Sequence, residues 1–252
     1  TICDAAKSAG VSAVIASDVA AIQYARQISL PVHISTQANI SNIEAVRFYA
    51  NFADVLVLAR ELTLEKIQAI HAAIESEPIL GPSGEPMKIE LFVHGALCVS
   101  ISSKCYMSLG LMNHSANRGD CLQTCRRTYR VTDTHTGNEL EIDNQFVMSP
   151  KDLCTIGFID KLMAAGLRVF KIEGRGRAAD YVYHTTRCYR EAVESVLDGS
   201  YSEEKIADWT RSLEGVFNRG FWHGGYYLGH ELGEWSGAYG SKATQQKTYI
   251  AY

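Results

Sequence analysis

The sequence predicts an α/β fold with parallel strands, and two observations lead to this prediction. Short apolar runs rich in β-branched residues recur along the chain, and each is accompanied by a segment with helical spacing. Regular alternation of strand and helix is typical of parallel sheets. A closed (β/α)₈ barrel needs more strands than the chain shows. We therefore expect either an open sheet or a TIM-barrel-like (β/α)₈ fold that is N-terminally incomplete.

The expected strands, about five of the eight in such a barrel, follow one another along the chain. They lie near residues 11–16, 31–36, 54–59, 88–94 and 167–172. The first three precede the helical segments "DVAAIQYARQ", "NIEAVRFYANF" and "TLEKIQAIHAAIE". A "HTGN" turn between polar, alternating flanks predicts an inserted β-hairpin at 126–147.

Two regions are expected along the chain. Residues 1–214 form the partial barrel, with a cysteine-rich loop at 98–125. From residue 215 the sequence is rich in glycine and aromatic residues, so 215–252 is predicted to be a linker followed by the start of a truncated small β domain at "KTYIAY".

Composition sets limits on the class of protein. The chain has 252 residues, of which 46% are hydrophobic and 21% charged, enough to bury a large core. The formal net charge of -4 gives no general attraction to nucleic acids, so RNA binding would need a local basic patch. No apolar run reaches the roughly 18 residues of a membrane span, and we expect a soluble, cytoplasmic protein without membrane contact. The seven cysteines are an odd count and favour reduced thiols over disulfides.

Four of these cysteines fall in one short stretch with the spacing C-x6-C-x15-C-x3-C, at Cys98, Cys105, Cys121 and Cys125. Thiolate sulfur suits zinc and iron–sulfur clusters. Structural zinc sites more often show two C-x2-C pairs, so an iron–sulfur cluster is the preferred reading and zinc the alternative. Cys154 is a rival for the fourth position. The plain alternative is that two of these cysteines are buried and two incidental.

Polar residues gather after the predicted strands, at the sheet edge where parallel α/β proteins bind ligands. Arginines could hold an anionic carboxylate or phosphate, and an aromatic ring could stack on a base. For any single arginine, solvated surface charge is an equal alternative. The candidate catalytic residues are Lys171, Glu173 and Arg175, and the candidate substrate-binding residues are Gln37, Asn39, Arg60, Glu61, Arg126, Arg127 and Tyr129.

Hydrolytic motifs are missing from the sequence. It has no H-E-x-x-H and no G-x-S-x-G, and its histidines are scattered. His94 and Cys98 follow the same strand, but four residues apart in extended chain they lie too far apart to form a catalytic pair unless the chain bends.

Several segments together resemble the peptidase U32 family, and the resemblance covers nearly the whole chain. These segments are "STQAN" (35–39), "ELFVHGALCVSISSKC" (90–105), "NRGDCLQTCR" (117–126), "MSPKDLC" (148–154) and "FKIEGRGRAADYV" (170–182). Members were named as collagenase-like proteases, while other relatives are oxygen-independent hydroxylation proteins. Within the family the chain looks most like the branch that forms 5-hydroxyuridine at the tRNA wobble position.

The resemblance implies a barrel-like fold, a 4Fe–4S cluster and prephenate as the hydroxyl donor. By position, Cys98, Cys105, Cys121 and Cys125 match the four iron–sulfur ligands of the tRNA branch. In the branch that acts on ubiquinone, the fourth ligand lies further along the chain, which keeps Cys154 as an alternative. From their positions at strand ends and beside the cysteines, we assign Arg60, Lys171 and Arg175 to a small dicarboxylate donor, and Arg126, Arg127 and Tyr129 to tRNA. A partner protein of unknown identity is a further possibility. A U32 peptidase and a non-catalytic metal-binding module remain alternatives.

The chain departs from the family pattern at both ends. The family's usual first strands, which read like "LLAPAG" and "AVYLG", are absent. The small β domain that follows the barrel is cut off at "KTYIAY". We therefore expect the sequence to be part of a longer protein.

Overall fold

The structure, a computed structural model, describes residues 1–102, 104–139 and 148–229. These residues form two compact units. The first unit consists of Thr1–Phe92, Asp160–Lys171 and Tyr226–Gly229. Within the described residues, the second consists of Val93–Ile159 and Ile172–Gly225.

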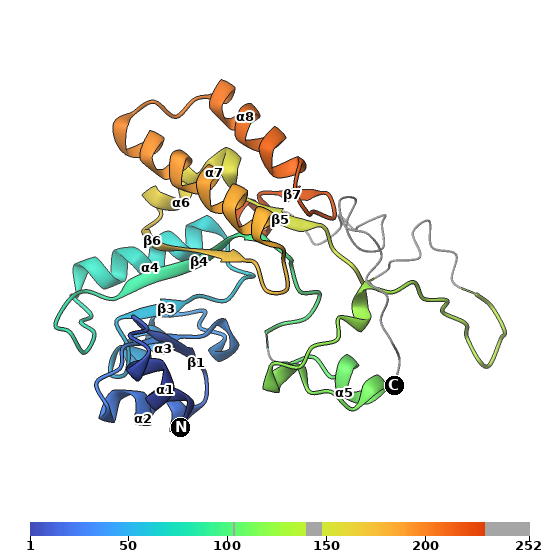
Figure 1. Cartoon of the computed structure of the whole chain (residues 1–252), viewed down its shortest axis with the longest axis horizontal. Helices are drawn as coiled ribbons and strands as arrows, with labels where there is room; N and C mark the ends of the chain where they lie inside the picture. Colours follow the sequence, from blue (N-terminus) through green and yellow to red (C-terminus); the bar gives the residue numbers. More distant parts are fainter. Residues whose placement is uncertain (103, 140–147, 230–252) are drawn as a thin grey trace. The chain divides into compact units, whose positions relative to one another are not determined.

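Parallel strands form the centre of the first unit. Strands β1 (Val14–Ala16), β2 (Val32–Ile34), β3 (Val55–Val57) and the first part of β4 (Lys88–Gly95) pair in parallel in that order. The helices of this unit are α1 (Ile2–Ser8), α2 (Val19–Gln27), η1 (Thr36–Ala38), α3 (Ile43–Ala50), α4 (Leu64–Ser76) and most of α6 (Ile159–Ala164), together with most of η5 (Gly225–Leu228) (Figure 1). The first part of β6 (Leu167–Glu173) also belongs here.

Local sequence explains these elements. The side chain of Asp18 accepts a hydrogen bond from the Ala21 amide and starts α2, and Asn42 starts α3 in the same way through Ala45. Strands β2, β3 and β4 are mostly buried, whereas β1 is partly exposed, with Ile15 55% exposed. Ile34, Leu56 and Ile67 are among the fully buried side chains of this core.

The second unit combines short strands with two long helices. Its strands are the end of β4, β5 (Asp152–Cys154), β7 (Phe221–His223) and the end of β6. Helices α7 (Ala179–Asp198) and α8 (Glu203–Glu214) lie side by side (Figure 1). The segment between β4 and β5 contains the short helices α5 (Met107–Met112), η2 (Ala116–Arg118) and η3 (Thr124–Arg126), and η4 (Ile156–Phe158) follows β5.

The α/β class is confirmed, but a closed barrel is not. The described strands pair in the order β1-β2-β3-β4-β5-β7, with β6 pairing with β4, so their sheet is open. The expectation of parallel strands also fails at one place, because β5 is antiparallel to β4 with His94 opposite Cys154. A parallel neighbour would need a crossover connection, and the described part of the chain between β4 and β5 holds the short helices α5, η2 and η3.

The five expected strands are all present, and two more were missed. β5 and β7 have only three residues each and pair in parallel with each other. β7 lies in the region that the sequence predicted as a linker. Of the expected hairpin, an antiparallel bridge joins Thr132 and Glu139, whereas 140–147 lie outside the described residues. The predicted start of a further β domain, within 230–252, also lies outside them.

Candidate functional site: a cysteine loop beside buried arginines

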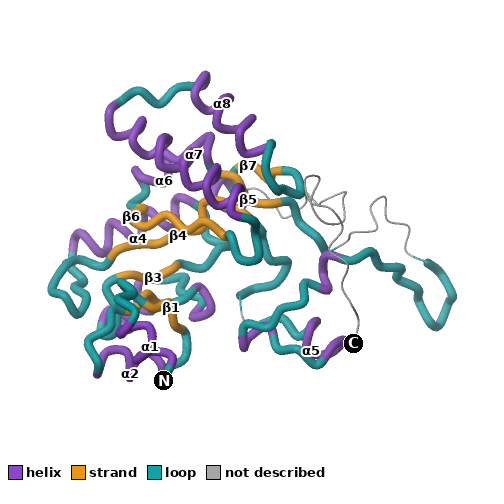
Figure 2. Tube along the Cα trace, in the orientation of Figure 1, coloured by secondary structure: helices purple, strands orange, loops and turns teal. Residues whose placement is uncertain are grey.

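Residues 98–125 form the cysteine loop, which leaves the end of β4 in the second unit. Outside its three short helices the loop is irregular backbone (Figure 2). All four of its cysteines are free thiols; Cys98 and Cys121 are exposed, and Cys105 and Cys125 are partly buried. Cys98, Cys105 and Cys121 therefore lie on irregular backbone, whereas Cys125 lies in the short helix η3.

The other three thiols of the loop each act on the titration of Cys125. Burial raises the pKa of the Cys125 thiol, the nearby Arg126 lowers it, and the charges of Cys98, Cys121 and Cys105 raise it further. Within the described residues, however, no three histidine, cysteine, aspartate or glutamate side chains converge closely enough to bind a metal ion. The thiols fit a thiolate-ligated group in type, number and neighbourhood, while their side chains do not have ligand geometry here.

Cys154 has a different environment. It is fully buried in β5, and the Tyr189 hydroxyl lies 3.9 Å from its sulfur. Burial raises the pKa of the Cys154 thiol to about 11, and the charges of Cys188 and Glu214 add to the increase. Such a thiol is packed as a small apolar side chain. Its role as a rival ligand stays a prediction, and it would require β5 to move.

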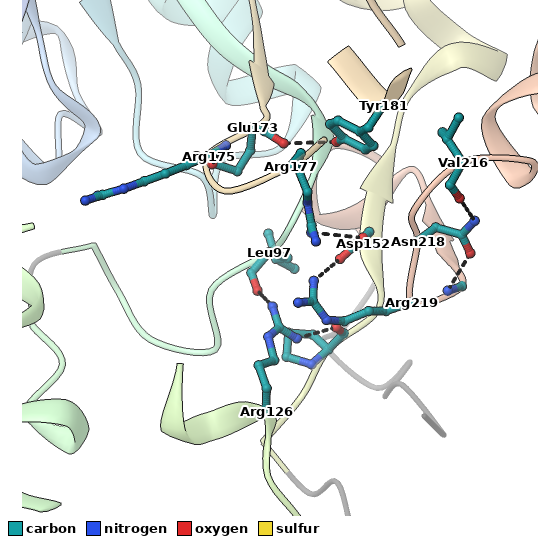
Figure 3. A network of polar contacts seen from close by, with 12 residues as sticks. Leu97, Arg126, Asp152, Glu173, Arg175, Arg177, Tyr181, Val216, Asn218 and Arg219 are labelled. Carbon is teal, nitrogen blue, oxygen red and sulfur yellow. Dashed lines mark hydrogen bonds and ion pairs between the residues drawn. The ribbon is translucent and has the colours of Figure 1, made fainter. Parts of the chain in front are cut away.

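Arg126 does not lie on the surface that the sequence predicted for RNA. It is 8% exposed, and its guanidinium lies inside the second unit (Figure 3). It donates to the carbonyl oxygen of Leu97, to the hydroxyl of Ser149 at 3.0 Å and to the carbonyl oxygen of Pro150 at 2.7 Å. Arg126 thereby joins both ends of the cysteine loop to the segment that leads into β5.

Asp152 is the acidic centre of a buried charged group (Figure 3). Arg219 donates to one of its carboxylate oxygens at 3.1 Å, and Arg177 lies 3.7 Å from the other. The Arg177 guanidinium also stacks 3.4 Å from the centre of the Phe217 ring. Arg219 reaches the side-chain oxygen of Gln123 in the cysteine loop at 3.4 Å. Asp152 and Arg219 were not predicted as site residues, although Asp152 lies in the segment "MSPKDLC" that resembles the family.

The candidate catalytic residues Glu173 and Arg175 lie beside this loop in the second unit. The Arg175 amide donates to the Glu173 carboxylate at 2.8 Å, and the Arg175 guanidinium donates to the carbonyl oxygen of Gly119. The Tyr181 hydroxyl donates to the Glu173 carbonyl oxygen at 2.9 Å. Arg175 is thus already engaged with the backbone of the cysteine loop.

Arg127 and Tyr129 follow the last cysteine of the loop. Arg127 is exposed. Tyr129 is partly buried, and its hydroxyl donates to the Thr124 carbonyl oxygen at 2.7 Å. Of the three residues predicted to contact RNA, Arg127 has the exposure that such a contact needs.

Lys171, the third candidate catalytic residue, belongs to the first unit. It pairs with the buried Glu90 at 3.1 Å, and the same carboxylate accepts a contact from His33 at 2.9 Å. Burial raises the pKa of Glu90, but the hydrogen bond with His33 and the charge of Lys171 outweigh it and lower the pKa overall. Lys171 therefore already has an anionic partner within the protein.

The remaining candidates also lie in the first unit. The Gln37 side-chain oxygen accepts a hydrogen bond from the Ser17 hydroxyl at 2.7 Å. Asn39 ends η1 in the left-handed conformation, which asparagine tolerates. Arg60 and Glu61 follow β3, and both affect the pKa of Tyr227, which burial raises. The three residues predicted to hold a dicarboxylate are therefore divided, with Arg60 and Lys171 in one unit and Arg175 in the other.

His94 is a packed residue rather than a general base. It is 1% exposed at the end of β4, and its Nδ1 lies 3.3 Å from the Tyr189 hydroxyl. Burial lowers the pKa of His94 to about 3, and the charges of Arg177 and His223 act in the same direction. The imidazole stays neutral at ordinary pH.

The fold and the loop define an α/β protein with a cluster of free thiols beside buried arginines. The family model "Peptidase family U32" matches residues 1–237. The chain belongs to this family, as the sequence predicted. No helix within the described part of the chain has the length and apolar character to cross a membrane.

Several curated proteins are similar to the chain. A protein named "Collagenase" from Porphyromonas gingivalis is 58% identical over 250 residues, covering 99% of this chain and 60% of the relative. The "tRNA hydroxylation protein P1" of Bacillus subtilis is 32% identical over 84% of this chain and 49% of the relative. The "23S rRNA 5-hydroxycytidine C2501 synthase" of Escherichia coli is 36% identical over 75% of this chain and 27% of the relative. No solved structure matches.

Proposed function

We propose that the protein containing this chain is an iron–sulfur-dependent, oxygen-independent RNA hydroxylation protein, with tRNA as its substrate and 5-hydroxyuridine as the product. The observation that carries the proposal is that four free thiols lie on one loop and that the other three act on Cys125. Two of the relatives are named for RNA hydroxylation, which gives the reaction class. The chain spans 60% or less of the relatives compared here, so the proposal concerns the whole protein.

The cofactor of the proposal is a 4Fe–4S cluster bound by Cys98, Cys105, Cys121 and Cys125, with zinc as the alternative. When bound, such a cluster supplies redox or Lewis-acid chemistry. The exposed Arg127 provides an RNA contact, because guanidinium groups pair with phosphate. A small dicarboxylate, prephenate in the proposal, supplies the hydroxyl group.

The donor site of the proposal changes with the structure. Arg60 and Lys171 are in the first unit, and Lys171 is paired with Glu90. Arg175 lies against the cysteine loop at Gly119 and is exposed, so it is the candidate best supported to contact a donor carboxylate. Glu173 holds the Arg175 backbone and acts as its positioning group.

The substrate is tested by comparing tRNA and rRNA nucleosides from cells with and without the gene. We expect 5-hydroxyuridine to disappear from tRNA on deletion and to return with the wild-type gene but not with Cys121→Ser. The Cys188→Ser variant is the matched control, because Cys188 is buried in α7. Nucleosides that do not change on deletion would refute the RNA proposal, and a loss confined to 5-hydroxycytidine would move it to rRNA.

A second candidate function is proteolysis, and one observation favours it. Identity to the relative named "Collagenase" is 58%, higher than the 32% to the tRNA hydroxylation protein. If the protein is a protease, the purified protein should cleave denatured collagen. Deleting its gene should then leave the RNA nucleosides unchanged. Absence of cleavage together with lost 5-hydroxyuridine would reject this candidate. Bound metal with neither activity would instead favour a non-catalytic metal-binding module.

A further inference from the structure

The buried charged group of the second unit has an excess of positive charge. Arg126, Arg177 and Arg219 are buried or nearly so at the guanidinium, and Asp152 is the one carboxylate that pairs with any of them in the described residues. Three guanidinium groups face one paired carboxylate, and although the charge of Glu173 also acts on Arg177, the group keeps an excess of positive charge. Burying an uncompensated charge is costly, so a further negative charge close by is expected.

The cysteine loop is where that negative charge can come from. The charges that act on Arg126 are, besides Arg219, those of Cys125, Asp152 and Cys98. Arg219 also contacts the loop directly through Gln123. Thiolates bound to an iron–sulfur core carry net negative charge, since the ligand charge outweighs that of the core. Thiolates in the loop would therefore supply negative charge next to the excess positive charge of the arginines.

Arg126 also has the geometry to hold the loop together. It follows Cys125 directly, and it donates to the carbonyl oxygen of Leu97, the residue directly before Cys98. Its other hydrogen bonds go to Ser149 and Pro150, close to Asp152. The planar guanidinium, with several donors in fixed directions, can bind these acceptors together, which a lysine ammonium cannot do in the same geometry.

We infer that Arg126 is a positioning residue for the cysteine site: it holds Cys98 and Cys125 near each other and, with Arg177 and Arg219, balances the charge of thiolates that bind a cluster. This inference rests on the proposed cluster and adds to it residues that are not ligands. Partners of this kind typically change metal affinity by about 10–100-fold when they are removed.

The inference is tested by anaerobic reconstitution with ferrous iron and sulfide in wild type, Arg126→Gln, Arg126→Lys and Arg130→Gln. Arg130 is the matched control, since it is exposed and pairs with Glu139 at 3.5 Å on the surface. The measurements are iron and sulfide bound per chain, the visible spectrum and the reduction potential of the bound cluster. Circular dichroism of the iron-free proteins monitors the fold.

We expect Arg126→Gln to bind iron at least about tenfold more weakly and its residual cluster to have a more negative potential, because a nearby positive charge is lost. Arg126→Lys should keep a potential close to wild type but still bind iron more weakly. Arg130→Gln should match wild type in both.

Equal loading and equal potential in wild type and Arg126→Gln would overturn the inference while leaving the cluster proposal intact. If both Arg126 variants are unfolded without iron, the residue serves the fold alone and the inference also fails. If wild type binds no iron and sulfide, the proposed function fails, and the same series with zinc alone shows whether Arg126 positions the thiols. If wild type and Arg126→Gln bind zinc equally well, the proposal that Arg126 positions the thiols is rejected as well.

Discussion

At the scale of single residues, burial separates arginines that act within the protein from those that face solvent. Arg126 and Arg127 are neighbours in sequence, yet Arg126 is buried with three acceptors and Arg127 is exposed. The sequence "CRRTYR" could not distinguish them, because the acceptors of Arg126 lie more than twenty positions away at Leu97, Ser149 and Pro150. Two adjacent arginines thus have different environments: Arg126 is held by the protein and Arg127 is exposed.

The Asp152→Asn variant should be strongly destabilised. Its carboxylate is 1% exposed and pairs with Arg177 and Arg219, so removing its charge leaves buried guanidinium groups without compensation. We expect a loss of about 3–5 kcal/mol in the free energy of unfolding, measured by urea denaturation. Asp208→Asn is the control, because its pair with Arg211 is exposed and should matter little. Equal stability of the two variants would contradict the buried charged group.

His94 should make the protein less stable in acid. Its folded-state pKa of about 3 lies below the ordinary value of 6.5, so between these values the unfolded chain binds a proton that the folded chain does not. Stability should therefore fall as pH decreases through this window, by about 1.4 kcal/mol per pH unit at most from this residue. Urea denaturation at pH 6 and pH 4 should show a smaller difference in His94→Gln than in wild type. His135→Gln, at an exposed loop position, should keep the wild-type difference; the same difference in His94→Gln would argue against a neutral buried imidazole.

At the scale of elements, long or repeated patterns were predictable and short ones were not. The strands β1 to β4 and β6 follow β-branched runs, so their positions could be read from the sequence. β5 and β7 have three residues each, "DLC" and "FWH", which is too short for a period to show. Their pairing depends on tertiary contacts, such as His94 opposite Cys154.

The cysteine loop was predictable as an element, whereas its surroundings were not. The clustering of thiols in 98–125 and its place after β4 are both visible in the sequence. Asp152 and Arg219 are 67 positions apart and meet only in the fold. The sequence places Lys171 near the end of a predicted strand. Its pairing with Glu90 could not be predicted, because it depends on two strands lying together in the first unit.

The end of β4 should tolerate no side chain at Gly95. Its φ of +109° is unfavourable for other residues, and an added Cβ would lie 2.5 Å from the Glu173 carbonyl oxygen. Gly95→Ala should therefore lower the thermal unfolding midpoint by more than Gly84→Ala, where φ is +82° but a Cβ meets nothing within 4 Å. Comparable shifts in the two variants would mean that the contact between the Gly95 and Glu173 backbones is looser than described.

At the scale of the whole molecule, the family is established and the activity is a proposal. The match to the U32 family spans residues 1–237, but relatives within it are named for collagen cleavage and for RNA hydroxylation. Fold membership alone does not decide between these activities. The proposed function depends on a cluster at the cysteine loop, so the loop is the part of the molecule to test first.

The most direct test is iron and acid-labile sulfide analysis with the visible spectrum, on protein purified without oxygen. Wild type, Cys125→Ser and Cys154→Ser form the series, since Cys125 interacts with the other loop thiols and Cys154 is buried in β5. We predict iron and sulfide with visible absorbance in wild type and in Cys154→Ser, and their loss in Cys125→Ser. Iron-free wild type with stoichiometric zinc, or loss of the cluster in Cys154→Ser but not in Cys125→Ser, would contradict it.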